Sequence, residues 1–353
     1  MIPEHKQAAV ALAIKTAFGV DQATDIRPLT AGLTTALVFR IVALDQPYLL
    51  KIIMNATGAR VPGGGDPTHQ FACLKLAAQA GIAPHVRYAS VEDGILITDF
   101  IEPKPLPADM VPLITPVLRT LHSLPKFPRP MMPWEMVVDG FVRRLEDAHI
   151  LPDHETAELF RQYWRLSAVY PRTDAELVAS HNDLKPQNML FDGSRILLID
   201  WEAAFLNDRY TDLALVANFL VKDEAGEACE AMEKRYLHAY FGEPAGDYRN
   251  ARFYLRRQAL HIFSAALLLM MAAKKGLRAK SHETPDFADF HRRLSSGEAD
   301  LANDETKLQY GMVHLREAVR NVQTPRFEAA LARVAAGQLR SLQQALICAG
   351  ASA

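Results

Sequence analysis

The chain has 353 residues, of which 49% are hydrophobic and 23% are charged, and its formal net charge is −2. This length is large for one hydrophobic core, so we expect two lobes, and the hydrophobic content argues against disorder. The nearly balanced charge provides no basic field for a polyanion, which excludes nucleic acid as an expected partner.

The cysteines and the apolar runs indicate the compartment. Cys73, Cys229 and Cys348 are far apart and follow no metal or redox spacing, which fits a reducing environment. The N-terminal residues contain no secretory apolar core. The longest apolar run, residues 265–273, is too short to cross a bilayer. We therefore expect a cytoplasmic protein without a membrane partner.

The first hundred residues combine helical and strand patterns. Apolar spacing predicts helices over residues 3–18 and 68–80, and residues rich in Val, Ile, Leu and Tyr predict strands over 35–41, 47–53, 86–88 and 94–100. A Pro-rich segment, residues 103–107, then interrupts the pattern. We place the lobe boundary there, which gives lobes of residues 1–101 and 102–353.

The second lobe is predicted to be mostly helical. Helices are expected over residues 110–123, 154–168, 212–219, 228–241, 249–275, 306–322 and 326–345. Together with the strands of the first lobe, this pattern indicates an α+β fold.

Residues 181–202 contain the pattern with the most chemical information. Asp183 and Asn188 lie on either side of Pro186, which cannot occupy a helix interior, so both are expected in a loop. A hairpin is predicted over residues 189–199, because the Asp-Gly pair at its turn accepts positive φ. The hairpin would return Asp200 to the side of Asn188.

These residue types suit phosphoryl transfer. Such a reaction needs Mg²⁺ on the phosphates and a carboxylate that orients and deprotonates the attacking hydroxyl. Magnesium prefers carboxylate and amide oxygens, so Asn188 and Asp200 are candidate metal ligands and Asp183 is the candidate base. The alternative is an ordinary loop carboxylate at Asp183 and a strand-terminating residue at Asp200.

The same residues resemble the aminoglycoside phosphotransferase and choline/ethanolamine kinase superfamily, and within it the bacterial choline-kinase-like branch. The family's catalytic loop has His-Asn-Asp or His-Gly-Asp, then four residues and Asn, and its metal strand has Ile-Asp-Trp/Phe-Glu. Residues 181–188 and 199–202 match both, and residues 207–214 are similar to a third segment that ends in Asp-Leu-Ala. The resemblance covers about residues 20–320. It implies a protein-kinase-like bilobal fold, with a nucleotide-binding N-lobe built on an antiparallel sheet and a helical, acceptor-binding C-lobe.

The resemblance also implies ATP or GTP as the phosphoryl donor, Mg²⁺ as cofactor and a small-molecule alcohol as acceptor: choline or another amino alcohol, an aminoglycoside, or a related sugar alcohol. Lys51 lies inside an apolar strand, where a charge needs a partner or access to solvent. By resemblance it holds the α/β-phosphates; the alternative is a lysine of an edge strand that reaches solvent. The resemblance implies two further nucleotide contacts. A loop with Thr34 and Thr35 would cover the phosphates, and backbone groups of Asp99 and of Phe100 or Ile101, at the end of the last strand, would bind the base. A plain turn and a simple linker are the alternatives for these two segments.

One expected residue is missing. The family pairs the strand lysine with a helix Glu, but the corresponding position here is Gln70, with no acid beside it in the helix. A neutral amide can hydrogen-bond Lys51 but cannot match a charge-assisted pair. Either the amide suffices, or a loop acid such as Asp66 substitutes, or catalysis is impaired.

Four further residues acquire expected roles. Lys185 would contact the γ-phosphate. His181 would pack under the loop and hydrogen-bond the backbone. Glu202 would reach the metal through water or line the acceptor pocket, with a solvent-facing strand carboxylate as the alternative. Asp212 would support the catalytic loop by resemblance, or cap a helix.

The acceptor and the function stay open at this stage. A quaternary ammonium group would need aromatic side chains, for which Trp134, Trp201, Phe205, Tyr210 and Tyr254 are candidates. An aminoglycoside would need acids, which are frequent over residues 286–305. A small-molecule kinase is favoured over a catalytically weakened nucleotide-binding scaffold or sensor. A protein kinase is third, because Asn182 replaces Arg, Trp-Glu follows Asp200, and no Ala-Pro-Glu segment is present.

Overall fold

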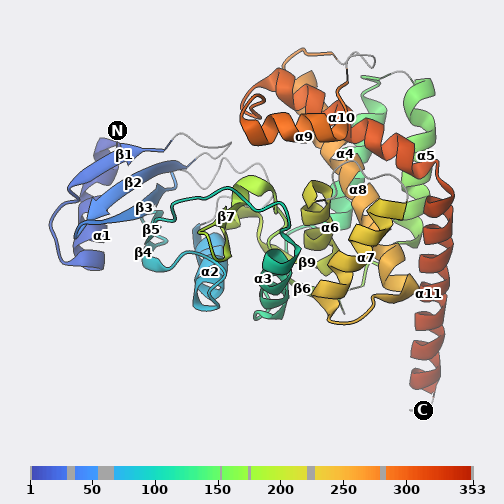
Figure 1. Cartoon of the computed structure of the whole chain (residues 1–353), viewed down its shortest axis with the longest axis horizontal. Helices are drawn as coiled ribbons and strands as arrows, with labels where there is room; N and C mark the ends of the chain where they lie inside the picture. Colours follow the sequence, from blue (N-terminus) through green and yellow to red (C-terminus); the bar gives the residue numbers. More distant parts are fainter. Residues whose placement is uncertain are drawn as a thin grey trace. The chain divides into compact units, whose positions relative to one another are not determined.

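The computed structural model describes residues 2–29, 36–54, 67–151, 153–173, 176–220, 227–278 and 284–350 (Figure 1). The chain packs into two compact units. Met1–Met131 and Val178–Asn207 form the first, and Met132–Leu177 and Asp208–Ala353 form the second. These units group residues by packing, so the division into a nucleotide-binding lobe of residues 1–101 and an acceptor-binding lobe of residues 102–353 stays a prediction.

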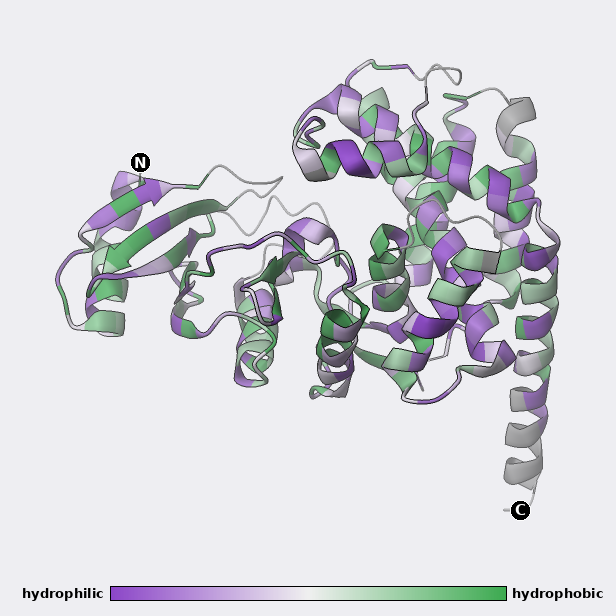
Figure 2. Cartoon of the chain, in the orientation of Figure 1, coloured by the Kyte–Doolittle hydropathy of each residue, from purple (hydrophilic) through white to green (hydrophobic). Residues whose placement is uncertain are grey.

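The first unit contains a five-stranded antiparallel sheet. Its strands are β1 (Asp25–Pro28), β2 (Leu37–Ala43), β3 (Gln46–Ile52), β4 (Val86–Ser90) and β5 (Ile95–Asp99), in the order β1-β2-β3-β5-β4. Strands β2 and β3 consist largely of hydrophobic residues (Figure 2). Side chains alternate across β3, so that Leu50 and Ile52 join the core with helix α1 (Glu4–Phe18), whereas Lys51 belongs to the opposite face. Because β3 lies between β2 and β5, the edge-strand interpretation of Lys51 is wrong.

The described remainder of the first unit contains two helices, two 3₁₀ turns, a short hairpin and a two-stranded sheet. It comprises α2 (Pro67–Gln79), α3 (Val111–Ser123), the 3₁₀ turns η3 (Pro186–Asn188) and η4 (Trp201–Ala203), the hairpin β7 (Met189–Phe191) and β8 (Ile196–Leu198), and the two-stranded sheet of β6 (Leu177–Ser180) and β9 (Phe205–Asp208). The predicted hairpin is confirmed. Its turn is a four-residue loop in which Gly193 has a φ of +104°, a conformation that favours glycine.

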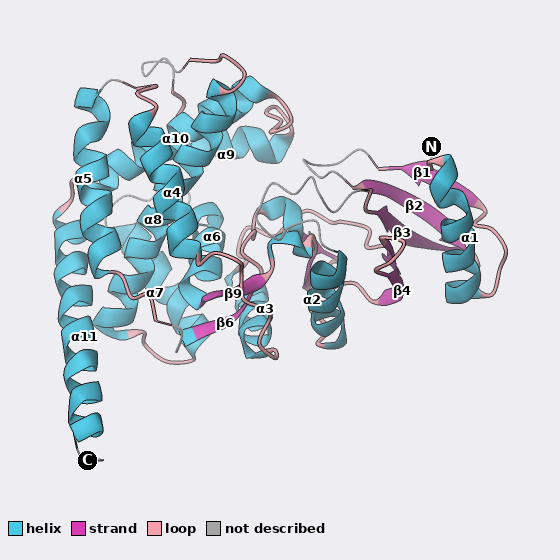
Figure 3. Ribbon diagram, turned by 180° about the vertical axis from the view of Figure 1, so that it is seen from behind, coloured by secondary structure: helices cyan, strands magenta, loops and turns pink. Residues whose placement is uncertain are grey.

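The described part of the second unit is helical (Figure 3). The exceptions are Leu177 at the start of β6 and Asp208 at the end of β9. Its helices are α4 (Trp134–Asp147), α5 (Asp153–Val169), α6 (Arg209–Leu220), α7 (Glu227–Phe241), α8 (Gly246–Ala273), α9 (Phe287–Ser296), α10 (Asp304–Val322) and α11 (Pro325–Gly350). Helix α8 is central and packs against α4, α6, α10 and α11. None of the described helices combines the length and the apolarity that a membrane crossing needs.

Most predicted elements correspond to observed ones within a few residues. The predicted helices correspond to α1, α2, α3, α5, α6, α7, α8, α10 and α11, and the predicted strands correspond to β2, β3, β4 and β5. Strands β1, β6 and β9 and helices α4 and α9 lie outside the predicted elements.

Buried charges of α8 are neutralised within the second unit. The Asp208 carboxylate accepts hydrogen bonds from Arg252 at 3.1 Å, Arg256 at 3.2 Å and the Tyr170 hydroxyl at 2.9 Å. Burial alone would raise the pKa of Asp208, but the two guanidinium groups hold it below its ordinary value. Arg256 also pairs with Glu135 at 2.9 Å. Removing one member would leave an uncompensated charge in the core.

A group of buried histidines joins α8, α9 and α10. The Nδ1 atoms of His261 and His314 are 2.9 Å apart, and His291 Nε2 is 3.0 Å from the Tyr310 hydroxyl. The Phe287 ring packs against all three imidazoles. In the hydrogen bond between His261 and His314, one Nδ1 donates and the other accepts, so the neutral pair has only one proton between these two atoms.

We expect the free energy of unfolding to decrease as the pH falls from 7.5 to 5.5. Burial, followed by His291, lowers the pKa of His314 to about 3; burial, with His314, Arg257, His291 and Arg320, lowers that of His261 well below its ordinary value. Below pH about 6.5 the unfolded chain binds protons that the folded chain does not. The loss is up to about 1.4 kcal/mol per pH unit for each histidine.

Urea unfolding at the two pH values measures this effect. The double variant His261→Gln/His314→Gln should show a smaller difference between pH 7.5 and 5.5 than the wild type. The variant His5→Gln, at an exposed position of α1, is the control and should keep the wild-type difference. An unchanged difference in the double variant would show that these histidines are not the source.

Candidate active site

The loop that follows β6 brings polar side chains together. Asn182 adopts a left-handed conformation, with a φ of +63°, which asparagine tolerates better than most residues. Pro186 begins the turn η3, whose fixed φ suits this position. The prediction that Asp183 and Asn188 belong to a loop with Pro186, and not to a helix interior, is confirmed.

Asp183, Lys185 and Asn188 are in direct contact. Asn188 donates through Nδ2 to both the main-chain oxygen and the Oδ2 atom of Asp183, each at 2.8 Å, and is 4% exposed. Lys185 Nζ lies 2.7 Å from the same Oδ2. Because Nδ2 is used in this way, the amide oxygen of Asn188 remains as an acceptor, and so does Oδ1 of Asp183.

The hairpin returns the chain to this loop. The Ile199 N–H donates to the Asn188 carbonyl at 3.0 Å, so the expected approach of Asp200 to Asn188 is confirmed at the backbone. Asp200 has a φ of +66°, a second left-handed residue. Its Oδ1 accepts a hydrogen bond from Lys51 Nζ of β3 at 3.2 Å. Lys51, which is 12% exposed, therefore has a carboxylate partner within the same unit.

Mutual electrostatics set the charge states of this cluster. Burial opposes ionisation of Asp200, but Lys51, Lys185 and His181 hold the pKa of its carboxyl below the ordinary value. Burial likewise opposes protonation of Lys185, yet Asp183, Asp200 and Glu202 raise its pKa. The pKa of Glu202 is raised, first by burial and then by Asp200. These interactions favour the ionised form of Asp200 and the protonated form of Lys185, and Glu202 protonates more readily than Asp200.

His181 connects the loop to the end of β8. It is fully buried, its Nε2 lies 2.9 Å from the Ile199 carbonyl, and its ring packs 4.8 Å from that of Trp201. Because a carbonyl can only accept, Nε2 donates. These contacts agree with the expected packing and backbone hydrogen bond of His181.

The structure describes only one of the residues that were expected to bind phosphate or to pair with Lys51 in the loops and helix around β2 and β3. Thr34 and Thr35 lie outside the described residues, as does Asp66. Gln70 is buried on α2, and in the described part of the chain Lys51 pairs with Asp200 and not with Gln70. Helix α2 contacts η4 and the residues directly after it. The Cys73 thiol lies 3.8 Å from the Ala204 carbonyl, and the His69 ring stacks 4.0 Å from the Phe205 ring.

At the end of β5, backbone groups are partly engaged. The Asp99 N–H donates to the His85 carbonyl at 2.9 Å and the Phe100 N–H to the Pro47 carbonyl at 3.4 Å. The Asp99 side chain forms a bidentate pair with Arg87. Within the described part of the chain the Ile101 N–H has no such partner, so it is the donor of this segment that a ligand could use.

Two buried carboxylates, Asp208 at the end of β9 and Asp212 in α6, belong to the second unit. Asp212 is fully buried in the first turn of α6. Sequence reasoning missed Asp208, whose two arginine partners lie more than forty positions away along the chain. A signal was available, because Arg252 and Arg256 are four residues apart and so lie on the same face of the predicted helix.

The aromatic residues and the acidic residues that were candidates for binding the acceptor make structural contacts instead. Among the aromatic residues, Trp201, Phe205, Tyr210 and Tyr254 are buried and Trp134 packs against the core of the second unit. The acidic run supplies helix caps at Asp286 and short ion pairs such as Asp304 with Lys307. Neither set therefore identifies the acceptor.

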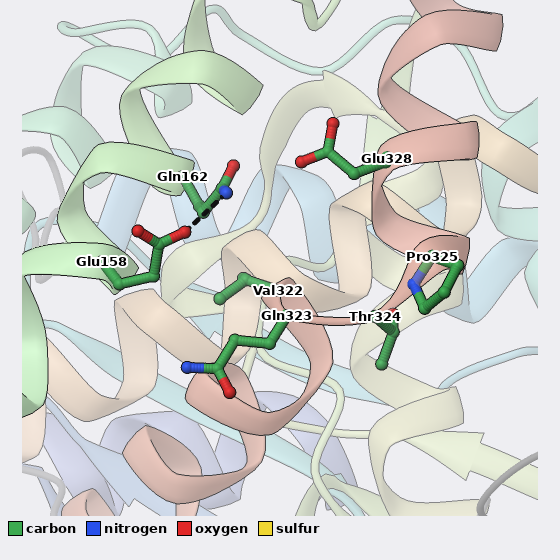
Figure 4. Close-up of a pocket in the computed structure, with 7 residues that line it drawn as sticks. All are labelled: Glu158, Gln162, Val322, Gln323, Thr324, Pro325 and Glu328. Carbon is green, nitrogen blue, oxygen red and sulfur yellow. Dashed lines mark hydrogen bonds between the residues drawn. The ribbon is translucent and has the colours of Figure 1, made fainter.

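A cavity of about 510 Å³ lies elsewhere in the second unit (Figure 4). Glu158 and Gln162 of α5 line one side and Glu328 of α11 the other, with residues 322–325 below. Glu158 pairs with Arg161, and Glu328 with Arg165. With its carboxylates neutralised in this way, the cavity offers no group suited to phosphoryl transfer.

The model of a family described as the phosphotransferase enzyme family matches residues 25–254. Two curated proteins named LicA from Haemophilus influenzae are 27% and 26% identical over 140 residues, or 39% of this chain; the matches span 38% and 48% of their own lengths. The chain thus matches less than half the length of either relative.

Solved structures extend the likeness to nearly the whole chain. A choline/ethanolamine kinase family protein from Mesorhizobium loti is 19% identical with a TM-score of 0.63, over 93% of this chain and 98% of that one. Spectinomycin phosphotransferase APH(9)-Ia, solved with ADP and spectinomycin, is 14% identical with a TM-score of 0.52, over 92% and 98% of the two chains. These likenesses confirm the predicted α+β, protein-kinase-like fold.

Proposed function

Because the chain belongs to the phosphotransferase enzyme family, we propose that it transfers the γ-phosphoryl group of ATP or GTP to a hydroxyl group of a small molecule. The membership confirms the predicted family and the predicted enzyme class, a small-molecule kinase. The observation that supports the proposal is the contact between Asp183, Lys185 and Asn188, beside an Asp200 that is paired with Lys51. These are the residue types that an in-line phosphoryl transfer requires.

In this proposal Asp183 is the general base. Its Oδ2 is fixed by Asn188 and Lys185, and Oδ1 remains to accept the proton of the acceptor hydroxyl. As the acceptor oxygen forms its bond to the γ-phosphorus, the bond to the β–γ bridging oxygen breaks and a nucleoside diphosphate leaves. The contact with Lys185 aligns the carboxylate and places a cation where negative charge develops.

The hard oxygens of the site suit Mg²⁺. The free amide oxygen of Asn188 and the carboxylate of Asp200 are its proposed ligands, with Glu202 acting through water. Two or three protein oxygens are enough, since water and phosphates complete the octahedron; no described set of three His, Cys, Asp or Glu residues forms a metal cage. When bound, the metal would neutralise phosphate charge and orient the transferring group.

The proposed nucleotide contacts lie on the sheet. Lys51 would exchange Asp200 for the α/β-phosphates. The N–H of Ile101, just after β5, which has no backbone partner among the described residues, would bind the base. Thr34 and Thr35 remain proposed members of the phosphate-covering loop, and Gln70 a proposed neutral neighbour of Lys51.

The proposed acceptor is an alcohol that carries an amine or a quaternary ammonium group: choline, another amino alcohol, or an aminoglycoside. The named residues include three carboxylates, Asp183, Asp200 and Glu202, against the two cations Lys51 and Lys185. Because Asp200 and Glu202 are assigned to the metal, the choice of acceptor follows the structural neighbours, which include a choline/ethanolamine kinase family protein and a spectinomycin phosphotransferase.

Release of ADP from Mg²⁺-ATP, followed with choline, ethanolamine, spectinomycin, other aminoglycosides and neutral sugar alcohols, tests the proposal. We expect turnover with at least one cationic alcohol and little with anionic ones. Transfer to a neutral sugar alcohol alone would refute the acceptor class. Nucleotide binding without transfer to any acceptor would refute the proposed activity.

A catalytically weakened nucleotide-binding scaffold or sensor is the second candidate. The observation that favours it is Gln70, which supplies no acid for Lys51, so the lysine pairs with the proposed metal ligand instead. Tight binding of ADP with no detectable transfer would support this function over the first.

A further inference from the structure

Asn182 links the candidate base to the segment that follows Asp200. Its Nδ2 is 2.9 Å from the Ala203 carbonyl, 3.3 Å from the Phe205 carbonyl and 3.4 Å from the Ser180 carbonyl. Its Oδ1 accepts a hydrogen bond from Asn207 at 2.7 Å. One amide therefore connects the loop of Asp183 with η4 and β9.

The geometry of Asn182 leaves its side chain little freedom. The left-handed φ of +63° directs the main chain into Asp183, while its Nδ2 donates to main-chain carbonyls and its Oδ1 accepts from Asn207. The two amide groups fix each other's orientation, because Asn207 can only donate through Nδ2. Networks of this kind position neighbouring groups when every member has partners.

Helix α2 holds the same segment from another direction. The Cys73 thiol contacts the carbonyl of Ala204, between the two residues whose carbonyls Asn182 contacts, and the His69 ring stacks on Phe205. Residues 203–205 therefore lie between α2 and Asn182. In this chain α2 reaches the catalytic loop through these residues, whereas Gln70 makes no hydrogen bond to Lys51 in the described structure.

From these contacts we infer that Asn182 is a positioning residue, which sets the placement of Asp183 relative to Asp200. The inference rests on the proposed phosphoryl transfer, since it assigns Asn182 to that reaction. Asn182 directly precedes the proposed base in the chain and hydrogen-bonds the segment that follows the proposed metal ligand Asp200, and no nucleotide contact is assigned to it. Its loss should therefore lower kcat and leave the KM for Mg²⁺-ATP nearly unchanged.

The variant Asn182→Gly tests this assignment, because glycine accepts the positive φ without strain and removes only the amide. We expect kcat to fall about 10- to 100-fold, the range for a misplaced catalytic group, with a KM for Mg²⁺-ATP within threefold of the wild type. Asn303→Ala is the matched control. It removes an asparagine whose side chain caps α10 in the second unit, so it should lower the melting temperature while kcat stays within twofold.

A second readout does not depend on turnover. Hydrogen exchange of the peptides that cover residues 181–188 and 200–207 should accelerate in Asn182→Gly and stay at the wild-type rate in Asn303→Ala. If the wild-type protein transfers phosphate to no acceptor, the proposed function fails, and exchange alone decides the inference. Unchanged exchange in both peptides would then overturn it.

A second variant covers a failure to fold. Asn207→Ala removes the donor to Asn182 but leaves the carbonyl contacts, so we expect a smaller loss of kcat, about threefold to tenfold, with the same unchanged KM. The inference is overturned if the folded variants keep kcat within twofold of the wild type, or if KM rises in proportion to the fall in kcat.

Discussion

Replacing Asp183 with alanine is expected to lower kcat by about 10²- to 10⁴-fold, the range for loss of a positioned general base. Affinity for Mg²⁺-ADP should stay within a few-fold of the wild type, because the nucleotide contacts are assigned to Lys51 and β5. The wild-type carboxylate is held at Oδ2 by Asn188 and Lys185. Alanine removes both the base and the acceptor that fixes these two side chains.

Steady-state kinetics with the best acceptor, together with calorimetric titration of Mg²⁺-ADP, measure the two effects separately. Asp45→Asn is a suitable control, since Asp45 is an exposed carboxylate in the turn between β2 and β3 with a φ of +58°, which asparagine tolerates. The control should match the wild type in both assays. Turnover of Asp183→Ala near the wild-type rate would show that another group accepts the proton.

Replacing Asp200 with asparagine should affect binding as well as turnover. We expect the Mg²⁺ dependence of ADP binding to be largely lost and kcat to fall by about 10³-fold, which corresponds to several kcal/mol of charge stabilisation by the metal. The physical reason is the loss of the carboxylate charge that Lys51, Lys185 and His181 keep ionised. Asparagine retains one oxygen ligand but supplies no charge.

The experiment compares titrations of ADP with and without Mg²⁺. Asp21→Asn is a matched control, because Asp21 forms a lysine pair of similar length, 2.9 Å to Lys15, on the exposed surface. It should leave the metal dependence unchanged. If Asp200→Asn binds Mg²⁺-ADP as tightly as the wild type does, Asp200 is not the metal ligand.

Much of the fold follows from local sequence patterns, and the elements outside the predictions have physical reasons. Strand β1 is a four-residue edge strand with mostly exposed side chains, so it has no apolar alternation. Strands β6 and β9 are equally short, and each depends on a partner far along the chain. Helix α9 is short and polar, and is stabilised by the Asp286 cap. Helix α4 had a usable signal, since Val138, Val142 and Leu145 follow a helical spacing.

In the candidate site, too, some features followed from the local sequence and others did not. Within residues 181–202, the hairpin pattern predicted the approach of Asp200 to Asn188, which is observed at the backbone. The contacts of Asp183 with Lys185 and Asn188 lay outside the predictions. The partner of Lys51 lies 149 positions away, and no local pattern could indicate that Asp200 occupies this position when α2 offers no acid. The contacts of Asn182 were missed for a similar reason, because they depend on the path of the chain through η4 and β9.

The Lys51–Asp200 pair has a consequence for the order in which ligands bind. Without ligands the ammonium and the carboxylate satisfy each other at 3.2 Å, so a divalent ion arriving alone must compete with lysine, and phosphates arriving alone must compete with aspartate. When both arrive together, each takes one member of the pair. Mg²⁺ and nucleotide should therefore show positive heterotropic cooperativity, and by reciprocity each should raise the affinity for the other by the same factor.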